Sequence, residues 1–147
     1  MKEVARNKRA YFDYEILEKF EAGISLLGQE VKAIKSGRIN LAGSYAILRA
    51  GEVWLLGADI PPYQPRNAPQ DYDSQRTRKL LLTEKEIKSL AGEIKGTGLT
   101  LVPLRAYIKG RLVKIELGLG KGKKKADKRE LIKKRETERE MRRTLRK

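Results

Sequence analysis

The residues best placed to do chemistry in this sequence are cations, and their spacing suits phosphate binding. The segment Arg76-Thr77-Arg78-Lys79 places three cations ahead of three leucines, where an exposed loop is expected to enter a strand. Arginine forks bind phosphate oxygens through two parallel hydrogen bonds, and a rigid element gives them a fixed register. A predicted helix carries Lys32 and Lys35 outward, with Glu30 nearby. Both segments are candidates for an anion site; a solvated surface with no partner is the alternative for each.

The side chains that most enzymes rely on are missing. The sequence has no Cys and no His, which removes thiol nucleophiles, histidine bases, disulfides and zinc-finger ligand sets. No two carboxylates stand at a spacing that suggests paired acid and base work. The stretch Gly120-Lys121-Gly122-Lys123-Lys124-Lys125 lacks the spacing of a phosphate-binding P-loop, so a hinge with phosphate-seeking lysines is favoured. These absences exclude zinc and thiol enzymes and leave catalysis with little support, and we expect no cofactor and no metal.

Net charge is the dominant feature of the composition. Of 147 residues, 34 are Lys or Arg and 19 are Asp or Glu, which gives a formal charge of +15. An excess of this size predicts a negatively charged partner: nucleic acid, an anionic membrane surface or an acidic protein. The chain shows neither a secretory signal nor a run of 18 apolar residues. We therefore expect a soluble cytoplasmic protein with no membrane partner.

The charge is concentrated at the C-terminal end, beyond a change in composition at Gly118-Leu119-Gly120-Lys121-Gly122. Residues 121–147 contain 14 basic and 5 acidic residues, a net charge of +9, against +6 for residues 1–120. The C-terminal stretch is rich in helix-forming residues but has too few apolar residues to bury a face. This predicts one folded domain, residues 1–120, and a basic tail, residues 121–147, disordered when free and helical when bound.

Short alternating segments predict a mainly β fold. The clearest strands form two antiparallel hairpins, Ser44–Arg49 with Glu52–Leu56 and Leu99–Ile108 with Leu112–Leu119. Further strands are expected within Tyr11–Leu27, either as one long strand or two short ones, and at Leu80–Leu82. Together with two or three short helices, these strands suggest an OB-like antiparallel β-barrel, an architecture that is also used on RNA and DNA.

Two helices are predicted between the strands. Thr83-Glu84-Lys85-Glu86 is a capping box, and the apolar residues that follow fall on one face until Gly96 supplies a stop. The other helix is expected from about Gln29 to Ser36 and should end at Gly37.

Four prolines make residues 61–75 an exposed, mobile loop. The aromatic residues are few, and most fall where a core would take them. Core packing is favoured for Trp54 and Tyr107, whereas Tyr63 and Tyr72 in the proline loop are the better candidates for exposure.

Six blocks then occur in one order along the chain: Asn7-Lys8-Arg9-Ala10, Glu21-Ala22-Gly23-Ile24, Gly28-Gln29-Glu30-Val31-Lys32, Arg78-Lys79-Leu80-Leu81-Leu82, Gly98-Leu99-Thr100-Leu101-Val102-Pro103-Leu104, and Gly122-Lys123-Lys124 followed by Asp127-Lys128-Arg129. Together they closely resemble the small protein B family, the SsrA-binding proteins of bacterial trans-translation. The resemblance implies an OB-like barrel and a non-catalytic adaptor that binds the tRNA-like domain of transfer-messenger RNA. It also implies passage with elongation factor Tu into stalled ribosomes, where the tail becomes helical in the vacant message channel.

The resemblance assigns Asn7, Glu30, Lys32 and the Arg78-Lys79-Leu80 block to an RNA-facing surface. The full predicted RNA-binding set is Asn7, Lys8, Arg9, Glu30, Lys32, Lys35, Arg76, Arg78, Lys79 and Leu80. The predicted ribosome-binding residues, which would face 16S ribosomal RNA in the decoding centre and message channel, are Lys121, Lys123, Lys124, Lys125, Asp127, Lys128, Arg129 and Leu145. Ala126 departs from the family pattern, where an aromatic or His side chain stacks on a ribosomal base, so the nearby lysines are expected to carry more of the binding.

Two other classes of function stay open on the residues alone. An RNA-processing enzyme would need clustered acids for metal ions, and residues 1–120 show none in sequence. A structural ribosomal protein would use the same basic tail to thread ribosomal RNA. It would stay with purified ribosomal subunits at high salt, whereas an adaptor should wash off.

Overall fold

The computed structural model describes residues 1–67, 70–123, 136 and 139. Its elements in chain order are β1 (Lys2–Arg6), α1 (Lys8–Asp13), β2 (Tyr14–Ile24), α2 (Gly28–Lys35), β3 (Tyr45–Arg49), β4 (Glu52–Leu56), the 3₁₀ turn η1 (Pro65–Asn67), β5 (Arg78–Leu81), α3 (Glu84–Thr97), β6 (Thr100–Lys109) and β7 (Leu112–Gly122). Within those described ranges, no helix has both the length and the apolar character needed to cross a bilayer.

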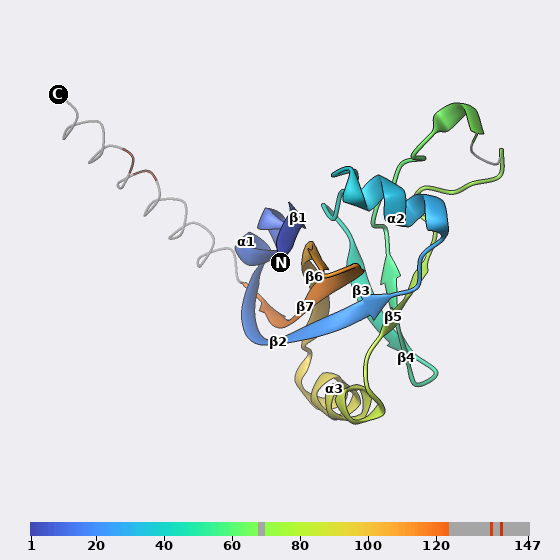
Figure 1. The fold of residues 1–147 in the computed structure, drawn as a ribbon. Helices are drawn as coiled ribbons and strands as arrows, with labels where there is room; N and C mark the ends of the chain where they lie inside the picture. The colour runs from blue at the N-terminus through green and yellow to red at the C-terminus, as the bar shows by residue number, and fades with distance from the viewer. Residues whose placement is uncertain (68–69, 124–135, 137–138, 140–147) are drawn as a thin grey trace.

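The strands form one mainly antiparallel sheet whose pairings close on themselves. The order is β1-β6-β3-β4-β5-β2-β7, and β6 also pairs with β7. The pairings of β6, β3, β4, β5, β2 and β7 therefore make a ring, with β1 outside it on β6 (Figure 1). Helices α2 and α3 lie at opposite ends of this arrangement. The prediction of a mainly β antiparallel fold with few helices is confirmed.

Alternation along the strands builds a single main core. On β4, Val53 and Leu55 are fully buried, while the residues between and beside them face outward. Ile34 of α2 and Leu90 of α3 pack into the same cluster as the inward residues of the strands. The helices thus fix their positions by the apolar faces they bury, and the loops and charged faces around them are presented outward.

Most of the helices and strands lie where the sequence patterns predicted them. Both predicted hairpins are present, β3–β4 and β6–β7. Helix α2 lies where it was expected, and α3 begins with the predicted capping box, in which Thr83 Oγ1 accepts from the N–H of Glu86 at 3.2 Å. The predicted stop at Gly96 is wrong: the helix continues through Thr97, and Gly98 takes the left-handed conformation at φ 67°.

Three further features differ from expectation. Strand β1 and helix α1 were not predicted, and β7 continues to Gly122 through pairing with Tyr14. Trp54 is half-buried on the outer face of β4, because the inward positions belong to its neighbours, so its predicted place in the core is wrong. Tyr107 is buried as expected.

Candidate nucleic-acid interface

An open groove lies where β2, α2, β5 and the β6–β7 hairpin meet. We call it the apolar–cationic groove; it has a volume of about 270 Å³ and is lined by Gly23, Ile24, Leu26, Val31, Leu81, Arg111, Leu112, Val113 and Lys114. Leu81 and Leu112 are 50% and 62% exposed. Exposed apolar surface beside cations indicates an interaction site.

Glycine at position 23 lets the two strands under the groove approach. Gly23 pairs with Leu81 between β2 and β5. A Cβ at this position would lie 3.2 Å from the Cβ of Leu81, which is tighter than ordinary contact. The absence of a side chain therefore helps to place Leu81 in the lining of the groove, with its side chain toward solvent.

A hydrogen-bonded set of charged side chains lies beside the groove on β2 and β6. The hydroxyl of Tyr107 donates to Oε2 of Glu21, and Lys109 Nζ lies 3.4 Å from the other carboxylate oxygen. The hydrogen bond from Tyr107 lowers the pKa of Glu21, and the nearby lysines act in the same direction. Burial and this same contact raise the pKa of Tyr107. Glu21 is therefore an anion whose charge is stabilised by Tyr107, Lys109 and Lys114.

A buried ion-pair hub joins α2 to the loop that precedes β5. It consists of Glu30, Tyr72, Arg76 and Arg78. Glu30 Oε2 accepts from Arg78 Nε at 2.8 Å, from Arg76 Nε at 3.1 Å and from the Tyr72 hydroxyl at 3.0 Å. Its other oxygen accepts from the Leu27 N–H at 2.8 Å, at the start of the helix. Glu30 is 1% exposed and Arg78 is 0% exposed.

The surroundings of Glu30 favour its charged form. Burial by itself raises the pKa of this carboxyl, but hydrogen bonds from Arg76, the Leu27 N–H and Arg78 outweigh it and lower the pKa to about 2. Arg78 also donates to the carbonyl oxygens of Ala58, Arg76 and Ser74 at 2.9, 3.1 and 3.0 Å. Helix, loop and strand are thus tied together by one saturated network.

The predicted RNA-binding residues do not form one surface. Four of them, Asn7, Glu30, Arg78 and Leu80, have side chains that are buried in the fold and not presented on its surface. The amide of Asn7 donates to the carbonyl of Pro103 at 2.9 Å and its oxygen caps α1. Arg76 and Lys79 are partly exposed but paired with Glu30 and Glu52. Lys8, Lys32 and Lys35 lie exposed on the surface, as does Arg9, whose Nε is 3.1 Å from Oδ2 of Asp13.

Of the predicted tail residues, Lys121 and Lys123 are among those that the structure describes. Lys121 is exposed on β7, and Lys123 Nζ donates to the carbonyl of Tyr11 at 3.1 Å. Lys124, Lys125, Asp127, Lys128, Arg129 and Leu145 lie outside the described residues. Of the two proline-loop tyrosines, Tyr63 is exposed as expected. Tyr72 is half-buried and bonded within the hub, so its predicted exposure is wrong.

Comparison with known proteins decides the family. The family model described as "SmpB protein" matches residues 4–147. This chain belongs to the SmpB family. An SsrA-binding protein from Synechocystis sp. is 50% identical over 145 residues, which cover 99% of this chain and 94% of that protein. An SsrA-binding protein from Carboxydothermus hydrogenoformans is 51% identical over 97% of this chain and 95% of its own length.

A solved structure agrees with membership of the SmpB family. A chain from "tmRNA-SmpB: a journey to the center of the bacterial ribosome" is 44% identical to this one, with a TM-score of 0.67. The match covers 82% of this chain and 85% of that chain. The antiparallel sheet described above is therefore shared with an SmpB whose structure has been solved.

Sequence reasoning missed most of the apolar–cationic groove. Leu81, Leu112 and Lys114 lie in segments that were interpreted only as strands, and Arg111 only as part of a turn. The sequence signal that could have revealed the groove is the alternation of inward and outward residues along the strands. Inward Leu80 and Val113 alternate with their outward neighbours, and an outward leucine on a rigid strand is a candidate for contact with a ligand.

Proposed function

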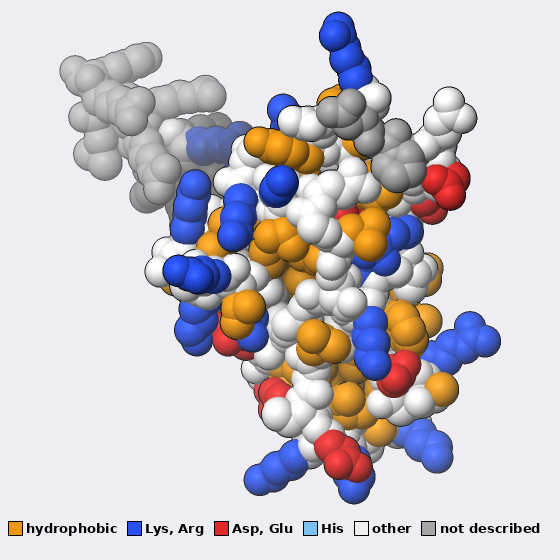
Figure 2. All heavy atoms as spheres, turned by 45° about the vertical axis from the view of Figure 1, so that its right-hand side comes forward, with side chains coloured by type: hydrophobic (Ala, Val, Ile, Leu, Met, Phe, Trp, Pro, Cys, Tyr) orange, Lys and Arg blue, Asp and Glu red, His pale blue; other side chains and the backbone are white. Residues whose placement is uncertain are grey.

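We propose that this protein is a non-catalytic RNA-binding adaptor that binds the tRNA-like domain of transfer-messenger RNA and delivers it to stalled ribosomes in trans-translation. The observation that carries the proposal is the apolar–cationic groove on a chain of the SmpB family with net charge +15. The names of the relatives, SsrA-binding protein and tmRNA-SmpB, support the identity of the RNA. On the face turned forward in Figure 2, apolar side chains lie among Lys and Arg side chains, as such a surface requires.

The groove is better suited to a folded RNA with unpaired nucleotides than to sequence-specific recognition of a double helix. A double-helical RNA offers side chains a major groove too narrow to read, so recognition depends on shape, backbone and unstacked bases. Leu81 and Leu112 can pack against an exposed base or ribose, while Arg111 and Lys114 meet phosphates. An unpaired loop of a tRNA-like fold presents both kinds of group.

The buried hub gives the predicted residues Glu30 and Arg78 a positioning role in this function. Glu30 is followed in α2 by Val31, one wall of the groove. Arg78 begins β5, which carries Leu81 at the opposite wall. Their ion pair holds these two walls in register without touching the RNA.

The remaining parts of the proposal concern architecture and partners. The ring of strands would serve as an OB-like barrel, and the basic tail, residues 121–147, would enter the vacant message channel and become helical against 16S ribosomal RNA. Elongation factor Tu would accompany the charged RNA to the ribosome, in the cytoplasm. The net charge of +9 on the tail supports an anionic, RNA-lined destination.

Binding of an isolated tRNA-like domain RNA, measured over a range of salt concentrations, tests the groove. Lys114→Ala should weaken binding and reduce the slope of log affinity against log salt by about 1. Leu81→Ser should weaken binding roughly tenfold with an unchanged slope, because it removes apolar contact only. The matched control is Lys88→Ala on α3, where the side chain is exposed and is not part of the groove lining. Equal effects from Lys88→Ala, or none from either groove variant, would refute the proposal.

A further inference from the structure

A second depression lies on the outer face of the β3–β4 hairpin, beside β5 in the sheet (Figure 1). We call it the hairpin face; its volume is about 420 Å³, within the range of ligand sites. The lining comes only from the two strands, the turn between them and the residue before β5, so no helix of the described chain forms part of it. The lining residues are Ile47, Arg49, Ala50, Glu52, Trp54, Leu56 and Thr77.

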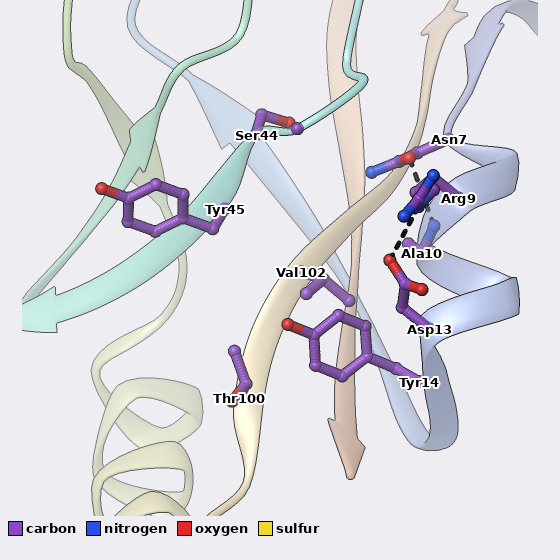
Figure 3. A pocket seen from close by; sticks show the side chains of 10 residues that line it. Asn7, Arg9, Ala10, Asp13, Tyr14, Ser44, Tyr45, Thr100 and Val102 are labelled. Atoms are coloured by element: carbon purple, nitrogen blue, oxygen red, sulfur yellow. Dashed lines mark hydrogen bonds and ion pairs between the residues drawn. The ribbon is translucent and has the colours of Figure 1, made fainter. Parts of the chain in front are cut away.

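The outward side chains of the hairpin are mostly apolar, although they do not belong to the core. Ile47 lies opposite Trp54, and Tyr45 lies opposite Leu56; directly opposite side chains share a face. None of these four is in either core cluster of the described chain. Tyr45 is 48% exposed, and Figure 3, which looks into the pocket beside α1, shows its ring turned away from Tyr14. The hairpin therefore presents two aromatic side chains outward, which indicates an interaction surface.

A tight turn holds this surface in a fixed shape. Ala50 and Gly51 both take the left-handed conformation, with φ of 54° and 74°, as in a two-residue type I′ turn. The turn joins Arg49 and Glu52, which lie opposite each other at the end of the hairpin. The outward side chains are thus presented on a regular, fully paired backbone.

The charges on this face favour a negatively charged ligand. Arg49 is exposed and takes part in no ion pair within the described ranges. Lys79 of β5 lies opposite Trp54, and its Nζ is 2.9 Å from Oε1 of Glu52. The side chains of that pair are 41% and 43% exposed, and an exposed pair is weak enough for a phosphate to compete with the carboxylate. Two cations therefore stand beside the indole against one carboxylate.

The hairpin face continues into the apolar–cationic groove along β5. Thr77, Lys79 and Leu81 alternate with two buried residues, so they lie on the same face of the chain. Thr77 lines the hairpin face, and Leu81 lines the groove. An RNA held in the groove can therefore extend past Lys79 to Trp54 over one continuous surface.

We propose that the hairpin face binds a single-stranded stretch of RNA beside the groove, with a base against Trp54 and phosphates toward Arg49 and Lys79. The inference rests on the proposed RNA-binding function and extends its surface across β4 and β3. Stacking on an aromatic ring supplies affinity for any base, because every base has a flat π-face. Tyr45 is a diagonal neighbour of Trp54 on the next strand, within reach of the adjacent base. An acidic peptide would meet the same cations but offers no base to stack.

Trp54 is the single tryptophan of the chain, so its fluorescence reports directly on this site. Titration of the full-length protein with single-stranded decauridylate at physiological salt should quench it. Trp54→Ala should weaken binding of the labelled RNA, measured by fluorescence anisotropy, about tenfold to a hundredfold. Trp54→Phe should weaken it less, because a phenyl ring still stacks. Tyr63→Ala, which removes an exposed tyrosine from the proline loop, is the matched control and should change neither measurement.

The phosphate contact has its own readout. Arg49→Ala should weaken binding and reduce the slope of log affinity against log salt by about 0.7, the value for one phosphate of a single strand. Lys88→Ala, which removes an exposed cation on α3, should leave the quenching curve unchanged. Equal effects from the two variants would overturn the assignment of Arg49 to the hairpin face.

The outcomes also separate this site from the groove. Lys114→Ala should weaken binding of the tRNA-like domain and leave the quenching of Trp54 by decauridylate intact, which would support two separate contacts. Absent quenching at millimolar decauridylate, or unchanged binding by Trp54→Ala, would overturn the hairpin face even where binding of the tRNA-like domain still depends on Lys114. Quenching by decaglutamate at the same concentrations as decauridylate would overturn the assignment of this face to RNA.

Discussion

Replacing Glu30 by Gln should destabilise the fold more than any exposed charge change in the part of the chain that the structure describes. The side chain keeps its shape, but Arg78 is then left fully buried without a carboxylate. Removal of one partner from a buried, hydrogen-bonded ion pair costs about 3–5 kcal/mol. That is a large part of the roughly 5–15 kcal/mol by which small domains are stable.

The lowered pKa of Glu30 leads to a similar magnitude for the same set of contacts. The fall from 4.5 to about 2, at ~1.4 kcal/mol for each pKa unit, corresponds to roughly 3 kcal/mol of folding free energy. Because the pKa is lower in the folded protein, this contribution is complete above about pH 4.5 and is lost as the pH falls toward about 2. The difference in stability between wild type and Glu30→Gln should therefore be largest at neutral pH and shrink through this window.

Urea unfolding, followed through the fluorescence of the single tryptophan, measures both effects. Glu52→Gln is the matched control, because Glu52 pairs with Lys79 at 2.9 Å on the surface, and an exposed pair contributes less than about 1 kcal/mol. A loss of under 1 kcal/mol for Glu30→Gln at pH 7, or a difference from wild type that does not change between pH 5 and 2, would refute the reasoning.

A double variant tests whether the hub is more than one ion pair. Glu30→Gln combined with Arg78→Met removes the buried charges, and for a simple pair it should recover much of the lost stability. Arg78 also satisfies the carbonyl oxygens of Ala58, Arg76 and Ser74. We therefore expect little recovery, since those buried acceptors lose their donor. Recovery to near wild-type stability would show that the carbonyl contacts contribute nothing.

Three further predictions concern packing, capping and the tail. Gly118→Ala should lower the free energy of unfolding in urea by about 1–3 kcal/mol, because its Cβ would lie 2.9 Å from Leu104 Cδ1. A Cβ at Gly122 would meet nothing within 4 Å, so Gly122→Ala should be tolerated. Equal losses of stability in the two variants would contradict this. Thr83→Ala should lose about 1 kcal/mol with its helix cap, and Thr83→Ser should not; a neutral Thr83→Ala would disprove the role of the cap. Deletion of residues 124–147 should leave binding to the tRNA-like domain intact and abolish tagging on stalled ribosomes, so parallel loss of both activities would argue against separate roles for body and tail.

Elements specified by neighbouring residues could be predicted, and elements specified by distant partners could not. The capping box at Thr83 and the hairpin turn at Ala50-Gly51 carry their own signals, and both elements are where the sequence indicates. Strand β1 is charged and shows no alternation. It exists because its backbone pairs with β6, as in Ala5 with Ala106, about a hundred residues away.

The errors at Trp54 and at the end of α3 have different causes. The period of β4 already assigns Val53 and Leu55 to one face, so an outward Trp54 follows once that face is known to be buried. The C-terminal end of α3 cannot be predicted in this way. Gly96 and Gly98 both satisfy the local rule for a stop, and only the observed chain direction into β6 shows that Gly98 takes the left-handed conformation.

The candidate site illustrates the same limit for charged residues. A sequence shows that Glu30 and Arg78 are ionic, but not that they lie 2.8 Å apart across 48 residues and away from solvent. The sequence does not distinguish an exposed cation from a buried one, because only the fold brings a buried cation to its partner. A buried pair at the junction of α2 and β5 lets the protein set the spacing of Val31 and Leu81 independently of its RNA. An exposed pair in the same place would compete with phosphates for each charge and would loosen whenever RNA bound. We therefore expect the buried pair of Glu30 and Arg78 to hold the shape of the groove whether or not RNA is bound.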